Sequence, residues 1–351
     1  MGKQVLDPPV LELSQTDLAE PVATKSKYYN LSYDQALQLV GGFGIFQYAM
    51  TTLMILNIFT GILIHTLPFL ESYPDHECQQ PDGTWASCER EHICSSELQG
   101  GQWRIDYTSP DSWYNFVDPD KLDLTCTNGT LIGLIGSAYF IGFGISCIFV
   151  PRMGDLYGRR ITFLVCMWLQ TVAYMLVYYT KSLNLTVIYF GIIGICQPGR
   201  LIISTMIMCE YSEEKRMPVL NSLIHGSDTV SAVVFIALIT LMKNYIPFFH
   251  VLLIYCFVVN MLDLFIPESA KFYLANHRYQ DARSALYLIA RINRSKVTKQ
   301  EIDSIVFDVQ IKNHEQADQN RGSKLTDEVI SNQQASTRPQ IRLEGKLREV
   351  L

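Results

Sequence analysis

The chain has 351 residues, of which 48% are hydrophobic and 18% are charged, and its formal net charge is −6. This negative balance gives no indication of a nucleic-acid partner, and we expect none. The apolar residues are gathered into long blocks between polar ends, a pattern typical of proteins that cross a membrane several times.

Six apolar runs, each long enough for a helix to cross a bilayer, divide the chain. They fall at about residues 43–67, 130–150, 161–180, 186–208, 219–242 and 246–266. We therefore predict an all-α integral membrane protein with six transmembrane helices in a membrane domain over residues 39–268, in which Pro68 ends the first helix. Residues 1–38 are polar and predict a disordered cytoplasmic tail, with a short helix over 33–39 that leads to the membrane.

A long polar loop over residues 71–128 separates the first two runs and holds twelve acidic and three basic residues. It contains four cysteines, Cys78, Cys88, Cys94 and Cys126. An even group of cysteines in one loop predicts two disulfides in an oxidising compartment, with three possible pairings. A zinc site is the alternative, although the paired Cys-x-x-Cys spacing is missing. Asn128 and Asn184 begin glycosylation sequons close to the predicted membrane surface.

The distribution of lysine and arginine predicts the orientation. Between residues 151 and 291, the segments expected inside the cell carry nine such residues, whereas the two short outer loops carry only Lys181 and Lys243. We therefore expect a multi-pass protein of the plasma membrane with both termini in the cytoplasm and the long loop outside the cell. The nine inner residues are Arg152, Arg159, Arg160, Lys215, Arg216, Lys271, Arg278, Arg283 and Arg291.

A short charged stretch, residues 151–160, connects the second and third spans. We predict a very short loop here, with Asp155 at or near the start of the third helix, where the positive helix end favours an anion. Gly158 permits a close approach of two backbones, and Arg159 and Arg160 are able to reach carboxylates on neighbouring helices. Such a cluster suits a gate that holds helices together on one side of the membrane and releases them. The alternative is a simple topology signal.

Polar sequence follows the last span. Residues 269–312 are expected in the cytoplasm and include a cationic amphipathic helix at about 279–293, whose apolar residues recur at helical spacing. Residues 313–351 are irregular and polar, and they predict a second disordered tail.

Several of these motifs resemble the major facilitator superfamily. Residues 151–160 are similar to that family's Gly-x-Leu-Ala-Asp-Arg-x-Gly-Arg-Arg loop. Asp155, Gly158, Arg159 and Arg160 are retained, whereas Pro151, Met153, Gly154 and Leu156 depart from the pattern. Arg200, followed by Glu210 and Arg216, resembles the family's helix-four arginine and the charged loop after it. Glu268 lies in a segment similar to the family's Pro-Glu-Ser-Pro-Arg-Trp-Leu after helix six, with Ala270 in place of the second proline.

Other motifs resemble the organic cation and anion branch of that superfamily. Residues 41–47 look like the Gly-x-Phe-Gly-x-x-Gln that opens helix one, and the cysteine-bearing loop, with Leu-Asp-Leu-Thr-Cys at 122–126, is similar to that branch. The resemblance covers about residues 40–295 and implies the N-terminal six-helix half of a major facilitator fold. Because the family has twelve spans, we expect this chain to belong to a longer or oligomeric transporter.

Arg200 in span four and Asp228 in span five are expected at similar depths in the membrane, where buried charges are usually paired. We predict that the two side chains face each other. The pair either fixes helix packing or takes part in substrate or proton coupling, with His225 on the same helical face as Asp228.

Asn57, Tyr139, Gln170 and Gln197 are polar side chains at membrane depth, where helix-packing roles are common. The resemblance implies that helices one, two, four and five line the transport path, which favours Asn57, Tyr139 and Gln197 over Gln170. The expected cytoplasmic gate consists of Asp155, Gly158, Arg159, Arg160, Glu210, Arg216 and Glu268.

The sequence shows no Ser-His-Asp order, metal-ligand spacing or phosphate-binding glycine loop, so we expect no enzyme, cofactor or metal site. The resemblance implies transport of small organic ions or solutes by alternating access, with the substrate near the midplane between two halves. The expected partners are the lipid bilayer, the transported solute, and a second half or second copy. The alternative is a non-transporting half-transporter that acts as a membrane interaction subunit.

Overall fold

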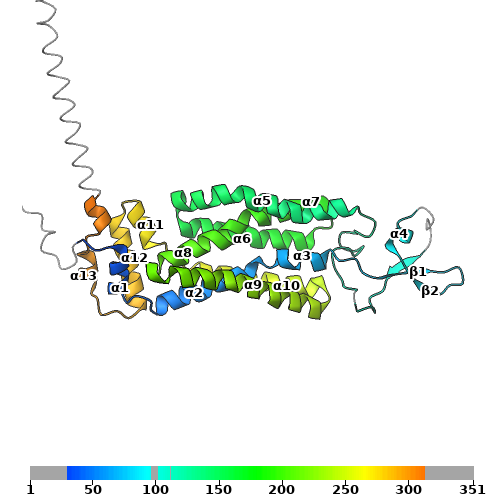
Figure 1. Ribbon diagram of the computed structural model, residues 1–351, viewed down its shortest axis with the longest axis horizontal. Helices are drawn as coiled ribbons and strands as arrows, with labels where there is room; N and C mark the ends of the chain where they lie inside the picture. The colour runs from blue at the N-terminus through cyan, green and yellow to red at the C-terminus, as the bar shows by residue number, and fades with distance from the viewer. Residues whose placement is uncertain (1–29, 96–101, 111, 313–351) are drawn as a thin grey trace, which may run out of the picture. The chain divides into compact units, whose positions relative to one another are not determined.

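The computed structural model describes residues 30–95, 102–110 and 112–312. Within these ranges, six helical segments are long and apolar enough to cross a membrane (Figure 1), which confirms the predicted fold class. They run over Ile45–Leu70, Gly129–Tyr157, Arg159–Tyr179, Leu183–Glu210, Glu214–Met242 and Tyr245–Asp263. Most of the predicted tails, residues 1–29 and 313–351, lie outside the described residues.

Three of the spans are continuous runs of shorter helical pieces. Span one consists of α2 Ile45–Ile58, the 3-10 turn η2 Phe59–Gly61 and α3 Leu63–Leu70. Span four consists of α7 Leu183–Pro198, the π-helical turn η4 Gly199–Ile203 and α8 Ser204–Glu210. Span five is α9 Met217–Met242, preceded by the 3-10 turn η5 Glu214–Arg216. The remaining spans are α5 Gly129–Tyr157, α6 Arg159–Tyr179 and α10 Tyr245–Asp263.

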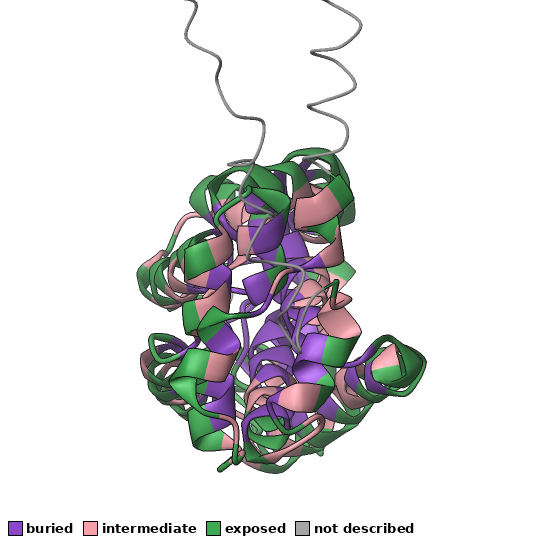
Figure 2. Ribbon diagram, turned by 90° about the vertical axis from the view of Figure 1, so that its left-hand side faces the viewer, coloured by how far each residue is buried: buried purple, intermediate pink, exposed green. Residues whose placement is uncertain are grey.

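The spans lie side by side, with buried residues toward the inside of the bundle and exposed residues at its periphery (Figure 2). Near the long loop the core is apolar and includes Leu67, Tyr174 and Phe249 from three different spans. At the periphery, α5 and α9 expose large apolar side chains such as Phe140 and Val233. An exposed apolar surface of this kind suits contact with lipid chains or with another helical surface.

Helices α5 and α7 cross with their backbones in direct contact. A Cβ built on Gly142 would overlap the carbonyl oxygen of Gly191, and one built on Gly194 would overlap the carbonyl oxygen of Tyr139. Small residues permit such crossings between membrane helices. In contrast, a Cβ on Gly144 of the same helix α5 would meet nothing within 4 Å.

The connection between the second and third spans is shorter than predicted. Helix α5 continues through Pro151 to Tyr157, and α6 begins at Arg159, so only Gly158 is non-helical. The predicted loop over 151–160, with Asp155 at or near the start of the third helix, is therefore wrong, since Asp155 lies in the last turn of the second. A proline is tolerated inside a membrane helix because neighbouring groups satisfy the freed backbone carbonyl.

Pro68 also lies inside a helix and does not end the first span as predicted. Helix α3 continues to Leu70, and the Glu71 N–H donates to the Leu67 carbonyl at 3.0 Å. Because Pro68 stands in the last turn, its missing N–H removes one hydrogen bond without preventing the turn from closing.

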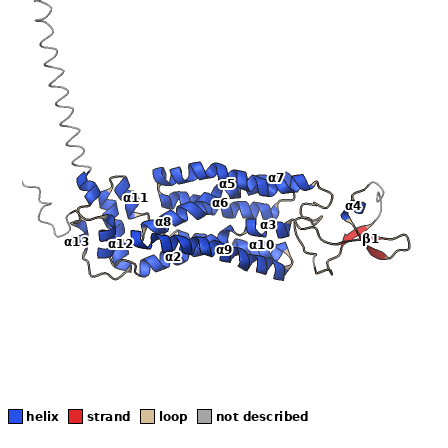
Figure 3. Ribbon diagram, in the orientation of Figure 1, coloured by secondary structure: helices blue, strands red, loops and turns tan. Residues whose placement is uncertain are grey.

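The long loop holds the strands that the structure describes (Figure 3). Strand β1 His76–Gln79 pairs antiparallel with β2 Trp85–Cys88 on one side and with β3 Trp103–Ile105 on the other, and α4 Arg90–Ile93 follows β2. The disulfides are Cys78–Cys88 and Cys94–Cys126. This pairing contradicts the zinc alternative, because none of the four thiols remains to bind a metal.

Lys121 attaches this loop to the third span. Its Nζ donates to the carbonyls of Val177, Tyr178 and Thr180 at distances of 2.7–2.8 Å. These carbonyls form the C-terminal end of α6, where the helix dipole favours a cation. Burial lowers the pKa of Lys121 to about 8, with a further contribution from the nearby Lys181 charge.

Short helices flank the membrane-spanning segments in the sequence. The helix expected over 33–39 is present as α1 Tyr33–Leu39. Helix α11 Ala270–Ala275 is capped by the Ser269 hydroxyl, which accepts from two backbone N–H groups. The predicted amphipathic helix is α12 Tyr279–Ile292, and α13 Lys299–Asp303 follows it.

The α5–α7 crossing predicts a position-specific effect of side-chain size. We expect Gly194→Val to destabilise the protein by about 1–3 kcal/mol, because the added side chain overlaps the Tyr139 carbonyl. The measurement is the unfolding midpoint in detergent micelles. Gly144→Val is the matched control and should leave the midpoint unchanged, whereas equal effects of the two variants would contradict this crossing.

Glu71 predicts a pH dependence of stability. One of its carboxylate oxygens is buried without a hydrogen-bond partner among the described residues, and burial raises the pKa of Glu71 from 4.5 to about 7. Between these values the folded protein binds more protons than the unfolded chain, so the contribution of Glu71 to stability falls as the pH rises.

We therefore expect Glu71→Gln to raise the unfolding temperature at pH 8 and to change it little at pH 5. Thermal unfolding in detergent at both pH values measures this difference. The exposed Glu91, replaced in the same way, should change the unfolding temperature at neither pH. An equal effect of Glu71→Gln at the two pH values would show that the carboxyl is not buried as described.

Candidate functional site

An ion pair between two membrane-spanning segments joins Arg200 to Asp228. Arg200 lies in the π-helical turn that follows Pro198, and its side chain is fully buried. Its Nη1 is 3.2 Å from Asp228 Oδ1, so the contact expected from the sequence is present. The same nitrogen donates to the Ile58 carbonyl at 2.6 Å. Such π-helical turns within α-helices are frequent at functional sites.

Residues of two spans complete the surroundings of Arg200. Its Nε donates to Gln197 Oε1 at 3.2 Å, whereas Nη2 has no hydrogen-bond partner among the residues described. Gly61, in the first span, lies directly against the guanidinium, and a Cβ at this position would overlap Arg200 Cζ. The position of the arginine thus depends on a glycine that sequence reasoning did not single out.

Asp228 is open on the side away from Arg200. Its side chain is 27% exposed, and its Oδ2 lies 4.0 Å from Nε2 of His65, which is 32% exposed. The sequence suggested His225 as the histidine near Asp228. The structure instead places His65 from the first span in contact with Asp228. Three spans together present a buried cation, an acid and a histidine at one place.

Asn57 makes a separate contact. Its Nδ2 donates to Asp263 Oδ1 at 2.7 Å, and both residues are fully buried, which joins the first span to the sixth. Tyr139 is buried within α5. Gln170 donates to the Thr60 carbonyl at 3.0 Å. Of the polar residues predicted to line a path, Gln197 is thus the one in hydrogen-bond contact with the Arg200–Asp228 pair, and sequence reasoning missed Asp263.

A second charged cluster lies where α5 turns into α6. Arg159 Nε is 2.6 Å from Glu210 Oε1, and Arg159 Nη2 is 3.3 Å from Asp155 Oδ1. Asp155 belongs to the second span, Arg159 to the third and Glu210 to the fourth. A single arginine therefore connects three spans at the same end of the bundle.

Glu268 binds the beginning of α6 in this cluster. Its carboxylate accepts from the backbone N–H groups of Arg159 and Arg160 at 3.2–3.3 Å, at the helix end that favours an anion. Gly158 has a φ of +107°, and any side chain there would overlap Glu268, so both conformation and space require glycine. Arg160 Nη2 donates to the Leu264 carbonyl at 2.9 Å.

Arg216, which was expected in the same charge network, contacts an aromatic ring. Its guanidinium carbon lies 4.8 Å from the centre of the Phe43 ring, a distance suited to a cation–π interaction. Phe43 precedes the first span and Arg216 precedes α9. The contact therefore joins the beginnings of the first and fifth spans.

A family model described as "Major Facilitator Superfamily" matches residues 107–291, which is more than half of the 351 residues. The chain belongs to the major facilitator superfamily. This match confirms the resemblance inferred from the sequence motifs.

Two curated relatives agree with the organic-ion branch of the major facilitator superfamily. Over 311 residues the chain is 21% identical to organic cation/carnitine transporter 2 of Homo sapiens, covering 74% of this chain and 54% of that protein. Over 312 residues it is 22% identical to organic anion transporter 3 of Rattus norvegicus, covering 80% of this chain and 56% of that protein. The chain thus spans about half the length of the curated relatives it matches.

The contact between Gly61 and Arg200 predicts a thermodynamic coupling. We expect Asp228→Asn to destabilise the wild-type chain by about 1–3 kcal/mol. In a Gly61→Ala background the same change should have little effect, because the new methyl group already displaces the guanidinium from Asp228. Unfolding of the four proteins of this double-mutant cycle in detergent measures the coupling.

Gly226→Ala is the control, since a Cβ on Gly226, in the same helix as Asp228, would meet nothing within 4 Å. Asp228→Asn should cost as much in that background as in the wild type. Additive effects of Gly61→Ala and Asp228→Asn would show that Gly61 does not position the arginine.

Proposed function

We propose that this chain forms half of a transporter that moves small organic ions or solutes across a membrane by alternating access, as part of a longer or oligomeric transporter. The observation that carries the proposal is the Arg200–Asp228 pair. Arg200 is buried, whereas Asp228 and the neighbouring His65 are partly exposed. Ionisable residues within membrane spans are costly, and they commonly belong to the pathways of substrates, ions or protons.

The family and the printed names of the relatives support this proposal. One relative is named as an organic cation and carnitine transporter and the other as an organic anion transporter. The buried cation of Arg200 and the partly exposed carboxylate of Asp228 provide charges of both signs at one place, so the site is able to attract either kind of ion. We propose that Asn57, Tyr139, Gln197, Arg200 and Asp228 line or support the path.

The charged cluster at the α5–α6 turn is proposed as the gate. Alternating access needs a contact that closes one side of the bundle and is able to open again. The ion pairs of Arg159 join three spans, and Glu268 fixes the segment after the sixth span to the beginning of the third. The proposed gate consists of Asp155, Gly158, Arg159, Arg160, Glu210 and Glu268.

The distribution of charges supports the proposed orientation. Lysine and arginine are concentrated at the end of the bundle that carries the gate, which favours its placement in the cytoplasm together with both termini. The two disulfides favour an oxidising compartment for the long loop. We propose that the protein resides in the plasma membrane with this loop outside the cell.

A second function is favoured by the exposure of two spans. Over an apolar stretch of 18 residues, α5 and span five are each 28% buried, against 61% for spans one and four. The exposed faces of α5 and span five are able to pack against a second half, a second copy or another membrane protein. In that second function the chain is an interaction subunit that does not itself transport.

Uptake into liposomes that contain the purified chain tests the proposed function. Labelled tetraethylammonium serves as the organic cation and labelled benzoate as the organic anion. We expect saturable uptake of at least one probe and its loss in Arg200→Gln and Asp228→Asn. Arg278→Gln, at an exposed position outside the spans, is the control and should transport normally.

Binding measurements on the same proteins separate the two functions. Saturable binding that requires Arg200 and Asp228, without uptake, would indicate that the chain needs a second half to complete the cycle. Absence of both binding and uptake would contradict the transport proposal and favour the interaction subunit.

A further inference from the structure

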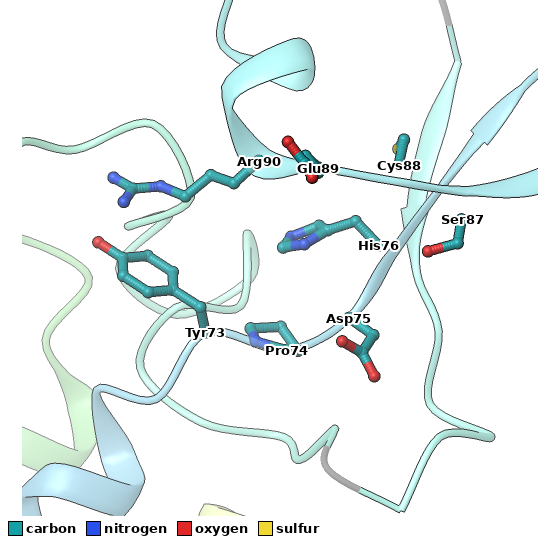
Figure 4. Close-up of a pocket in the computed structure, with 8 residues that line it drawn as sticks. All are labelled: Tyr73, Pro74, Asp75, His76, Ser87, Cys88, Glu89 and Arg90. Atoms are coloured by element: carbon teal, nitrogen blue, oxygen red, sulfur yellow. The ribbon is translucent and has the colours of Figure 1, made fainter.

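A cavity of about 490 Å³ lies in the loop between the first two spans, outside the membrane-spanning helices (Figure 4). It is open to solvent and is lined by the segment that leads into β1 and by the segment that joins β2 to α4. This volume is in the range of small-molecule sites in proteins. The cavity is separate from the Arg200–Asp228 pair and from the proposed gate.

His76 is the buried ionisable side chain among the residues that line this cavity. It is only 4% exposed, and one side of its ring packs near Trp103, with 5.6 Å between the ring centres. Figure 4 shows the imidazole directed into the space between Tyr73 and Glu89. Its Nε2 is buried and has no hydrogen-bond partner in the described part of the chain. A buried polar atom of this kind needs a partner, and the cavity is where a ligand is able to supply one.

The surroundings of His76 determine which partner it accepts. Burial lowers the pKa of His76, Asp75 opposes this shift and Arg90 adds to it, so the ring is neutral at pH 7. The backbone at Pro74 has the opposite influence and raises the pKa of the ring slightly. Because Nε2 is the buried nitrogen without a partner, the ring proton is assigned to Nδ1. In a neutral imidazole with its proton on Nδ1, Nε2 is an acceptor, so the ligand must be a donor.

The charged residues of the cavity favour a cation. Asp75 and Glu89 are both exposed at its rim. The one cation among the lining residues, Arg90, is engaged elsewhere: its Nε and Nη2 donate to the carbonyls of Thr125 and Thr127 at 2.5 and 2.6 Å. Its guanidinium also covers the Tyr73 ring, with the carbon 4.0 Å from the ring centre.

An organic cation fits these residues better than a metal ion. In the ranges that the structure describes, no group of three or more His, Cys, Asp or Glu residues is arranged to hold a metal. We propose that this cavity binds a small protonated amine, with its charge near Asp75 and Glu89 and one N–H donated to His76 Nε2. The proposal goes beyond the transport function, because it concerns binding in the loop and does not require movement across the membrane.

A matched pair of ligands tests the hydrogen bond. Benzylammonium and benzyltrimethylammonium carry the same charge and the same aromatic group, but only the first has N–H donors. We expect the full chain, purified in detergent with its disulfides intact, to bind benzylammonium about tenfold more tightly, the difference typical of one hydrogen bond to a charged group. Isothermal titration calorimetry measures both affinities.

Substitutions at His76 identify the acceptor. His76→Phe keeps a ring next to Trp103 but removes Nε2, so the affinity for benzylammonium should fall about tenfold, to that of the quaternary probe. His76→Gln offers an amide oxygen in place of Nε2 and should retain part of the preference. His92→Phe is the matched control, because His92 is exposed in the same loop and does not line the cavity.

Two further variants distinguish this site from the membrane pair. Glu89→Gln, at an exposed position, should weaken both probes alike, because it removes charge and not the acceptor. Asp228→Asn should leave benzylammonium binding in the loop unchanged, even if it abolishes transport. Equal affinities of the wild-type chain for the two probes, no binding of benzylammonium, or an unchanged preference in His76→Phe would each overturn the proposal.

Discussion

The structure depends on the position of one buried guanidinium in a bundle that has little else to neutralise it. A fully buried Arg200 is costly in a membrane protein unless its donors are engaged and its charge is balanced. Three spans engage Nε and Nη1 and balance the charge: the first supplies the Ile58 carbonyl and the space at Gly61, the fourth supplies Gln197, and the fifth supplies Asp228. Nη2 has no hydrogen-bond partner among the described residues. These contacts determine how closely the first, fourth and fifth spans approach one another at this depth.

The ends of the third span follow the same electrostatic principle. At its N-terminus the Glu268 carboxylate accepts from two backbone N–H groups, and at its C-terminus Lys121 donates to three backbone carbonyls. Each charge has the sign that the helix dipole favours. Glu268 comes from the segment after the sixth span and Lys121 from the long loop, so α6 is connected at both ends to parts of the chain that lie outside the spans.

The polar chemistry of the molecule therefore occurs at three separate places. The Arg200–Asp228 pair lies within the spans, the Arg159 cluster lies at one end of them, and the His76 cavity lies in the long loop. The first two account for a proposed path and a proposed gate in a member of the major facilitator superfamily. The third offers an acceptor and two carboxylates in a place where an amine is able to bind without entering the bundle.

The sequence by itself determined the six spans, their approximate limits and the Arg200–Asp228 contact, because hydropathy and helix length fix the depth of a residue in the membrane. It also indicated the family, through short motifs around Gly158 and Glu268. Only the tertiary structure decided which residues meet across helices and loops. Gly61 under Arg200, His65 beside Asp228 and Asp263 bound to Asn57 all join positions far apart in the chain. The structure also decided which of the three possible pairings the four cysteines adopt. Such contacts depend on the rotation and crossing of helices and on the path of the loop, which a local pattern of residues does not encode.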